Sequence, residues 1–398
     1  MAAAVVAFGA ASALGQAEAA FDVGEPGARP PEVWSSRAGG KPFGRVLSCT
    51  ASPSERPRAL LESGLEQVAE QLGAWDSEWR SLRLGVIVGT SSGGFAALER
   101  ALGAVGSAAP DPAHWARSAY FAPLSGALSR LGRARPPERL VSLYAACASS
   151  SLALGLGLRW LELGEIDLVI AGGYDAESGC VGAGFDALKA TSSAPPRPFR
   201  AERDGMALGE GVALLALTRS SERAYGFLRG FAATSDAVHI TAPDRTGRSL
   251  ARAAQGALVD AGLAASELGF VSVHGTATSF NDAAEAAALE LVFGEQAAQL
   301  QLHAFKSVVG HTLGAAGALE SLAALSALRR GVLPASASSG TAMPELPARL
   351  LDENVPSQAE HCLKLSTAFG GSNAALTLSR RAGPVVQRAR RSVYVVAA

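Results

Sequence analysis

The segment Tyr144-Ala145-Ala146-Cys147-Ala148-Ser149-Ser150-Ser151 joins an apolar, strand-like run to a long helical pattern. This order predicts a strand that ends just before a helix, with one thiol at the helix N-terminus. Unpaired N–H groups and the helix dipole favour a thiolate at such a position, so the pKa of the cysteine is expected to fall. A single cysteine is more often a buried structural residue, so a role for Cys147 needs support from elsewhere in the chain.

The order of a strand, this helix and a closing strand occurs twice. Residues 85–92 precede the helix after Cys147, and residues 210–219 form a closing strand. Residues 270–277 precede a second uncharged helix, and residues 371–380 close in the same way. Apolar strands that alternate with helices predict an α/β fold with sheets covered on both faces. We therefore expect two duplicated halves, residues 1–220 and 221–398, with the boundary near residues 220–224.

The two uncharged helices are expected at residues 148–164 and 312–331. Both segments are rich in Ala, Leu and Gly and carry almost no charge. A helix that is apolar on all sides is buried. The pair therefore predicts a buried central layer.

Two histidines end apolar runs beside a glycine. Residues 270–278 are Phe-Val-Ser-Val-His274-Gly-Thr-Ala-Thr, and residues 305–312 are Phe-Lys-Ser-Val-Val-Gly-His311-Thr. A histidine at a strand end is more often a hydrogen-bonded structural residue than a catalyst. His274 and His311, however, lie at strand-to-loop and loop-to-helix junctions, where side chains from separate segments converge on pockets. They are candidates to share a pocket with Cys147.

The motif set resembles the elongating β-ketoacyl-acyl-carrier-protein synthases of the thiolase superfamily, which serve fatty-acid and type II polyketide synthesis. The resemblance rests on Ala-Cys147-Ala-Ser, His274-Gly-Thr-Ala-Thr, Lys306 five residues before His311, and Phe369-Gly-Gly-Ser-Asn. It covers nearly the whole chain in the family's order. It implies a thiolase-like five-layered αβαβα fold and an acyltransferase that condenses malonyl-acyl-carrier protein with an acyl chain on Cys147, with loss of carbon dioxide. No cofactor is implied beyond the phosphopantetheine of the carrier protein.

The chemistry assigns a role to each of these residues. A thiolate can both take up and release an acyl group, so Cys147 is the candidate nucleophile. The N–H groups of Cys147 and Phe369 are the candidate oxyanion hole, at about 3 kcal/mol per donor. Neutral His274 and His311 are the candidate donors to the enolate that forms when carbon dioxide leaves. The helix dipole disfavours a protonated His311.

Further candidates support this site. Glu320 lies in an otherwise uncharged helix and needs a partner, so we expect an ion pair with Lys306 that orients the His311 loop; a purely structural pair is an equal alternative. The resemblance places Thr276 and Thr278 against the phosphopantetheine arm. It also makes Asp282 and Glu285 supporting acids, although carboxylates are favoured in any first helical turn. Phe369 is expected to act as a gate.

Composition excludes other classes of function. The net charge is −1 and no basic run is interleaved with aromatics, so nucleic acid is not an expected partner. The four cysteines lack CxxC spacing, which predicts reduced thiols in a cytoplasmic protein and no metal site. No run is long enough to cross a membrane. The apolar N-terminus lacks a charged region, so we expect a strand at residues 4–8 and a turn at 9–15 rather than a signal peptide.

The chain departs from the family pattern in places. Ala368 replaces the usual glycine before Phe369, and Phe280 and Asn281 replace a small turn. Residues 21–61 are expected to be short and irregular, and the tail after Arg381 an extra strand.

Three rival functions remain to be weighed. Non-catalytic chain-length factors usually lack the cysteine, and thiolases or chain-initiating synthases use a second cysteine or an asparagine where this chain has histidine. A chain-releasing or decarboxylating relative stays open, as does fatty-acid versus polyketide service. The expected partners are an acyl carrier protein and either a second copy or a related subunit in a dimer. A cluster of arginines either forms a positive rim for the carrier or a solvated helix end; it comprises Arg130, Arg133, Arg135 and Arg139.

Overall fold

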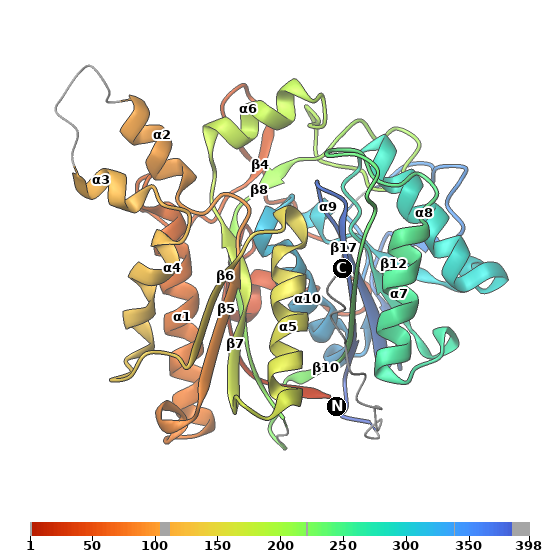
Figure 1. The fold of residues 1–398 in the computed structure, drawn as a ribbon. Coiled ribbons are helices and arrows are strands. Elements are labelled where there is room, and N and C mark those ends of the chain that lie inside the picture. Colours follow the sequence, from red (N-terminus) through yellow and green to blue (C-terminus); the bar gives the residue numbers. More distant parts are fainter. Residues whose placement is uncertain (1, 104–111, 220–221, 338, 384–398) are drawn as a thin grey trace, which may run out of the picture.

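The chain folds into five layers, in the order helix, sheet, helix, sheet, helix (Figure 1). The computed structural model describes residues 2–103, 112–219, 222–337 and 339–383. Helix α1 (Arg56–Trp75) covers the first sheet, and α7 (Arg248–Ala261) and α8 (Ser279–Phe293) cover the second. Helices α5 (Ser149–Leu163) and α10 (Ala316–Arg330) lie between the sheets. The predicted αβαβα architecture is confirmed.

The two sheets have the same strand order and the same directions. The first runs β6-β5-β7-β9-β1, and the second runs β12-β11-β16-β17-β10 with β14 added at its edge. In each half three strands are parallel and the last two are antiparallel to their neighbours. Strands β1 and β10 pair at one end and join the sheets. The strands are β1 (Ala3–Ser12), β5 (Leu84–Gly89), β6 (Arg139–Leu143), β7 (Leu168–Asp175), β9 (Gly211–Thr218), β10 (Gly226–Ser235), β11 (Phe270–Ser272), β12 (Gln301–His303), β14 (Arg349–Leu350), β16 (His361–Thr367) and β17 (Ser372–Ser379).

The core follows from the apolar spacing of each element. In α1, Leu61, Leu65, Val68 and Leu72 recur three or four residues apart, which places them on one face, packed on the first sheet. Strands β5 and β7 are buried along their whole length, as expected of central parallel strands covered on both faces.

The middle layer is only partly as predicted. Helix α10 is buried from Ala316 to Leu328, and its leucines share one core with leucines of α5 and strands of both sheets. Helix α5 is not buried on all sides: Leu156 is 38% exposed and Leu163 is 64% exposed. The reason is position, because α5 lies at an open side of the middle layer (Figure 1).

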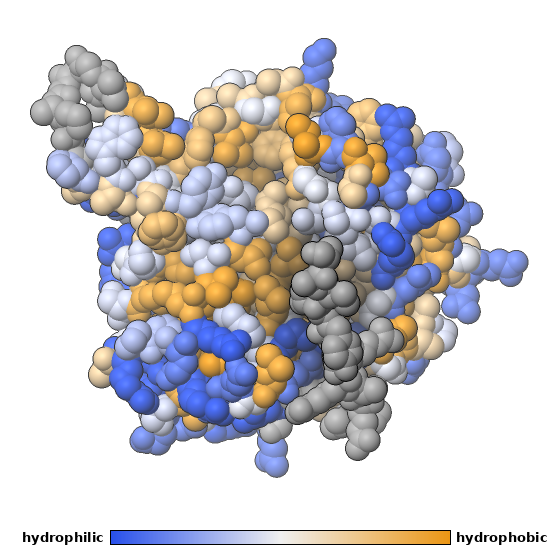
Figure 2. Space-filling model, in the orientation of Figure 1, coloured by the Kyte–Doolittle hydropathy of each residue, from blue (hydrophilic) through white to orange (hydrophobic). Residues whose placement is uncertain are grey.

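An apolar band crosses the face on which α5 and β6 lie (Figure 2). Strand β6 is the edge strand of the first sheet and pairs with β5 alone in the described part of the chain. Leu140 and Tyr144 near this edge are 45% and 44% exposed, and Phe121 is 62% exposed.

Two predicted element boundaries differ from those in the structure. Strand β1 continues to Ser12, beyond the predicted end at residue 8, and α1 begins at Arg56 inside the segment expected to be irregular. The predicted boundary at residues 220–221 and most of the predicted tail strand, residues 384–398, lie outside the described residues. Shorter elements are β2 (Gly15–Gln16), β3 (Ser35–Ser36), β4 (Pro42–Gly44), β8 (Leu208–Gly209), β13 (Val332–Leu333), β15 (Val355–Pro356), α2 (Phe95–Gly103), α3 (Pro112–Arg117), α4 (Ala122–Ala127), α6 (Gly179–Ala187) and α9 (Lys306–Val309).

Candidate active site

Cys147 and His311 lie at equivalent junctions of the two halves. Cys147 is in a single 3-10 turn, Ala146–Ala148, between β6 and α5; His311 precedes the equivalent turn, Leu313–Ala315, before α10. Each turn contains a non-glycine residue with positive φ, 45° at Ala146 and 52° at Leu313. Such backbone persists only where the surrounding structure holds it, at a cost of about 1–3 kcal/mol.

The duplication brings the starts of α5 and α10 into contact. The Ala318 N–H donates to Ser150 Oγ at 3.0 Å, across the two helices. Gly317 makes this approach possible, because a Cβ there would lie 2.0 Å from Ser151 Oγ. The thiol and the imidazole are therefore held on neighbouring helix ends.

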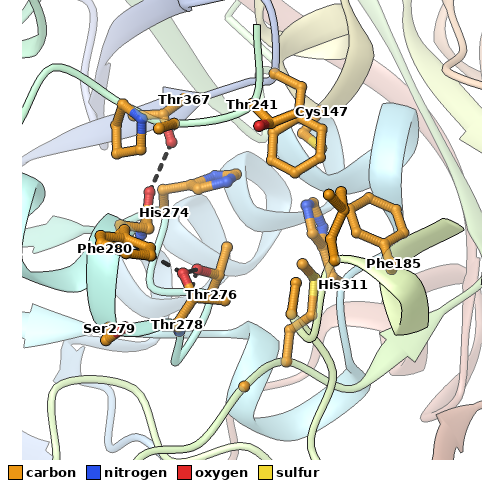
Figure 3. Close-up of a pocket in the computed structure, with 18 of the residues that line it drawn as sticks. Cys147, Phe185, Thr241, His274, Thr276, Thr278, Ser279, Phe280, His311 and Thr367 are labelled. Carbon is orange, nitrogen blue, oxygen red and sulfur yellow. Dashed lines mark hydrogen bonds between the residues drawn. The ribbon is translucent and has the colours of Figure 1, made fainter. Parts of the chain in front are cut away.

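The candidate nucleophile and both candidate histidines line one cavity of about 410 Å³ (Figure 3). Cys147, His274 and His311 all line it, although their exposed fractions are only 7%, 4% and 1%. The two imidazole rings lie 5.3 Å apart, nearly perpendicular. Residues far apart in sequence thus meet in a largely buried pocket. The other predicted residues that line it are Thr276, Thr278 and Phe369.

The hydrogen bonds determine which nitrogen of each histidine carries a proton. Lys306 Nζ lies 3.2 Å from His274 Nδ1, and the Leu313 N–H donates to His311 Nδ1 at 3.2 Å. An ammonium and an amide N–H can only donate, so both Nδ1 atoms are acceptors. We therefore assign the proton of each neutral ring to Nε2.

The predicted ion pair is present, with Lys306 Nζ 2.5 Å from Glu320 Oε1. Its side-chain direction differs from the expectation: the ammonium contacts His274 rather than the His311 side chain. The other carboxylate oxygen, Glu320 Oε2, lies 2.6 Å from Lys364 Nζ. Glu320 therefore bridges two buried lysines.

Burial determines the ionisation of the three central groups. It lowers the pKa of His274 and of His311 well below the usual range, with the Lys306 charge acting in the same direction. Burial also raises the pKa of the Cys147 thiol to about 12, while Lys306 opposes that rise. The expected depression of the Cys147 pKa is therefore wrong: desolvation outweighs the favourable charges around this residue.

Cys147 and Phe369, whose N–H groups are the candidate oxyanion hole, both line this cavity. The Phe369 N–H has no hydrogen-bond partner among the described residues. The Cys147 N–H interacts with its own thiol and opposes the rise in the pKa of that thiol. The Phe369 ring lies 5.5 Å from the ring of Phe185 on α6. This loop is anchored, since the Gly370 N–H donates to the carbonyl of Ile240 at 2.8 Å.

Asp282 and Glu285 support the loop that carries His274. Glu285 accepts the N–H groups of His274 and Gly275 at 2.6 and 2.8 Å, and Asp282 accepts the Phe199 N–H at 2.8 Å. Burial raises the pKa of Asp282 to about 6 and that of Glu285 to about 7. These side chains hold backbone and do not line the cavity.

Comparisons with known proteins now identify the family. Residues 56–223 match the family model "Beta-ketoacyl synthase, N-terminal domain", and residues 225–339 match "Beta-ketoacyl synthase, C-terminal domain". The chain is 31% identical over 330 residues to a 3-oxoacyl-[acyl-carrier-protein] synthase 2 of Rhizobium meliloti (strain 1021), covering 77% of this chain and 76% of that protein. The chain belongs to the β-ketoacyl synthase family.

Two further relatives extend the comparison. The tetracenomycin polyketide synthase ketoacyl synthase alpha subunit of Streptomyces glaucescens is 34% identical over 66% of this β-ketoacyl synthase and 65% of the relative. A solved ketosynthase in complex with its chain length factor from Xenorhabdus doucetiae superposes with a TM-score of 0.80 at 31% identity, covering 95% of this chain and 97% of that one. The non-catalytic alternative is not favoured, because Cys147 and both histidines share the cavity.

The sequence prediction missed Lys364 and Asp175. Asp175, at the end of β7, accepts the N–H of Ser91 at 2.8 Å and that of Gly314 in the second half at 2.6 Å. It is fully buried and links the two halves beneath the cavity. A signal existed for both residues, since each is a charged side chain within or at the end of an apolar strand.

Of the two alternatives for the arginine cluster, the structure does not favour the positive rim. Arg139 begins β6 and Cys147 follows its end, so an extended strand of about 15 Å separates this arginine from the cysteine. Arg133 is buried and donates to the carbonyl of Leu82, and Arg130 pairs with acids of α1. The cations that line the cavity are Lys189 and Arg203.

The departures from the family pattern also have structural outcomes. Ala368 packs beside the cluster that contains Cys147, and Asn281 Oδ1 accepts the hydroxyl of Thr367 at 2.8 Å. Phe280 is 55% exposed at the cavity. In the described part of the chain no group of three His, Cys, Asp or Glu side chains is placed to hold a metal. Nor is any described helix long and apolar enough to span a bilayer.

Proposed function

We propose that this β-ketoacyl synthase holds an acyl chain on Cys147 and joins it to the carbon of a malonyl thioester with loss of carbon dioxide. The observation that carries the proposal is the convergence of one thiol and two Nε2–H donors on a single buried cavity. A thioester condensation needs both: a sulfur to carry the acyl group, and donors fixed where negative charge develops.

In the first half-reaction Cys147 Sγ attacks the thioester carbonyl of the acyl carrier. The oxyanion of the tetrahedral intermediate accepts the N–H groups of Cys147 and Phe369. The carrier thiol leaves and takes the proton that the Cys147 thiol gives up. Because burial keeps this thiol protonated at neutral pH, the carbonyl must be polarised and the proton removed together.

In the second half-reaction a malonyl thioester occupies the cavity. Its carbon–carboxylate bond breaks, carbon dioxide leaves, and the electron pair forms an enolate whose oxygen accepts the Nε2–H groups of His274 and His311. The enolate carbon attacks the acyl thioester on Cys147, and the tetrahedral intermediate expels the Cys147 thiolate. Neutral imidazoles suit this role, since each keeps Nε2–H as a donor while Nδ1 is held as an acceptor.

The substrates are proposed to arrive on the phosphopantetheine of an acyl carrier protein. Thr276 Oγ1 and Thr278 Oγ1 lie 2.9 Å apart at the cavity and are candidates to hydrogen-bond that arm, although Thr278 also caps α8. Lys189 and Arg203, which line the cavity, are the candidate cations for the carrier in place of the upstream arginines. A relative named as acting on acyl-carrier-protein substrates supports this source.

A dimer is proposed through the open edge of β6. Leu140 of β6 and Tyr144 just after it are exposed, and an uncovered sheet edge can pair with another strand. An apolar band crosses the face on which β6 lies (Figure 2). A solved relative is a ketosynthase in complex with its chain length factor, so the second subunit is either a copy or a related chain. Light scattering should find a dimer, and Leu140→Asp should weaken it; an active wild-type monomer at micromolar concentration would contradict the proposal.

Mass spectrometry tests the proposed chemistry. The protein is incubated with a panel of acyl carriers of different chain length and type, and the acyl group is mapped to a cysteine peptide. We expect one added acyl group on Cys147, none after Cys147→Ala, and product only when malonyl carrier is supplied. Acylation of Cys49, Cys180 or Cys362 in place of Cys147 would refute the assignment.

A further inference from the structure

Lys364 is a fully buried lysine that the proposed mechanism does not use. It lies in β16 with an exposed fraction of 0%, behind the cavity wall rather than in it. We propose that Lys364 is a positioning residue: it holds one oxygen of Glu320, which leaves the Lys306 ammonium directed at His274 and gives the buried cluster an excess positive charge that keeps both imidazoles neutral. This inference rests on the proposed function.

The geometry divides one carboxylate between two ammonium groups. Glu320 Oε1 lies 2.5 Å from Lys306 Nζ, and Oε2 lies 2.6 Å from Lys364 Nζ. Lys364 Nζ lies at ion-pair distance from Oε2 without the geometry of a hydrogen bond, and Glu320 contacts Lys306 through Oε1. A second proton of the Lys306 ammonium then points to His274 Nδ1, 3.2 Å away. This contact is what places the His274 proton on Nε2, toward the cavity.

The neighbours of Lys364 leave Glu320 as its close anionic partner. In the strand register Ser272 of β11 lies beside Lys364, and His303 of β12 lies beside Ser272. Both are neutral: burial lowers the pKa of His303 to about 3, and the Lys364 charge acts in the same direction. The ammonium also donates to the carbonyl of Leu365.

The bridge of Lys306, Glu320 and Lys364 carries an excess of one positive charge. Two lysines and one carboxylate form the bridge, so the cluster carries +1 when all three groups are ionised. The Lys364 charge acts on both His274 and His311 and lowers the pKa of each, after burial and the Lys306 charge. Glu285 and Lys306 contact His274 directly, and Glu320 and Lys364 lie behind Lys306. The other titratable or charged groups that share its cavity are Cys147, Lys189, Arg203, Asp204, Asp236, His239 and His311.

Stability does not explain this arrangement. Moving a charge out of water costs several kcal/mol, and an apolar side chain of similar size is often as stabilising as a buried ion pair. Methionine has nearly the length of lysine and would fill the same space between β16 and α10. Methionine lacks the positive charge of the ammonium group. We therefore assign the role of Lys364 to its charge.

The test compares variants that differ in cluster charge. Lys364→Met reduces the excess from +1 to zero, and leaves Glu320 paired with Lys306. The double variant Glu320→Gln, Lys364→Met restores +1, now on Lys306 alone. Release of carbon dioxide from malonyl carrier is measured from pH 5.5 to 8, and the melting temperature confirms that each variant is folded.

We expect no imidazole titration in the wild-type profile, because imidazoles with strongly lowered pKa stay neutral over this range. Asp282 and Glu285, whose pKa burial raises to about 6 and about 7, titrate within the range in every variant, so each profile is compared with that of the wild type. Removing a nearby positive charge favours protonation, so in Lys364→Met the imidazole pKa values rise and activity at the acid end falls relative to the wild type. The double variant should move this acid limb back to its wild-type position. A Lys364→Met profile that drops equally at every pH, or an acid limb that the double variant fails to move, overturns the inference.

A second measurement does not depend on activity. Imidazole ¹⁵N shifts of the free protein report the tautomer and the titration of His274 and His311. We expect Nε2–H rings that stay neutral at pH 5.5 in the wild type and that titrate at higher pH in Lys364→Met. If the wild type releases no carbon dioxide, the proposed function is wrong. If the wild type is active and the imidazoles of Lys364→Met titrate as in the wild type, only the inference about Lys364 is wrong.

Discussion

Replacing His311 tests the assignment of its two nitrogens. The ring accepts the Leu313 N–H at Nδ1 and offers Nε2–H to the cavity. His311→Ala removes one pre-organised donor, which is worth about 2.7–4 kcal/mol, or about 10²–10³-fold in the rate of carbon dioxide release. Acyl transfer onto Cys147 uses the backbone N–H groups instead, so it should fall by less than about tenfold.

Substitution of His311 by Gln or Asn tests the roles of Nε2 and Nδ1 separately. In His311→Gln the terminal amide reaches about as far as Nε2 and can still donate to the enolate, whereas in His311→Asn it reaches only to the level of Nδ1. We expect Gln to recover at least about tenfold over Ala, and Asn to recover little. The assay follows the two half-reactions separately, as carbon dioxide release and as radiolabelled acyl transfer. Equal loss of both half-reactions, or Asn and Gln variants of equal activity, would refute the reasoning.

Three further predictions follow from the same structure. Cys147→Ala should abolish condensation in a folded protein, and Cys147→Gln should keep decarboxylation because its amide imitates the acyl-enzyme; wild-type condensation by the Ala variant would disprove the role of the thiol. Gly317→Ala should destabilise the protein by about 1–3 kcal/mol in urea unfolding, since the new methyl meets Ser151, and Ser151→Gly should recover part of that loss. Burial raises the pKa of Asp282 to about 6 and of Glu285 to about 7, so the native protein binds protons that the unfolded chain has released. The stability that these two groups contribute is complete below about pH 4 and is lost as the pH rises to 7. The double variant Asp282→Asn, Glu285→Gln should reduce this loss of unfolding free energy. An unchanged slope in the double variant would show that other groups cause the loss.

Several features could be predicted from the sequence because they depend on local pattern. Apolar runs that alternate with uncharged helices indicated the two halves. Small residues around Cys147 and glycines beside His274 and His311 marked the junctions where a site forms. The isolated charge of Glu320 in an apolar helix predicted its pairing with Lys306, since an unpaired buried carboxylate is too costly.

Other features depended on which segments meet in space. Burial of Cys147 under the Phe369 loop reverses the pKa shift that its helix end alone predicts, because desolvation depends on everything packed around the thiol. Arg139 is close to Cys147 in sequence but lies at the far end of β6, because an extended strand carries its ends apart.

The sequence by itself indicated two α/β halves, a buried central layer and the three residues of the candidate site, because periodicity and junction chemistry depend on local sequence. Only the tertiary structure decided the protonation pattern. The Nδ1 partners of the two histidines come from the start of α9 and from the turn before α10, and Glu320 meets Lys364 only when β16 packs against α10. The interaction energy between two charges depends on the distance between them and on their burial. For charges far apart in sequence, both are set only when the two halves fold together.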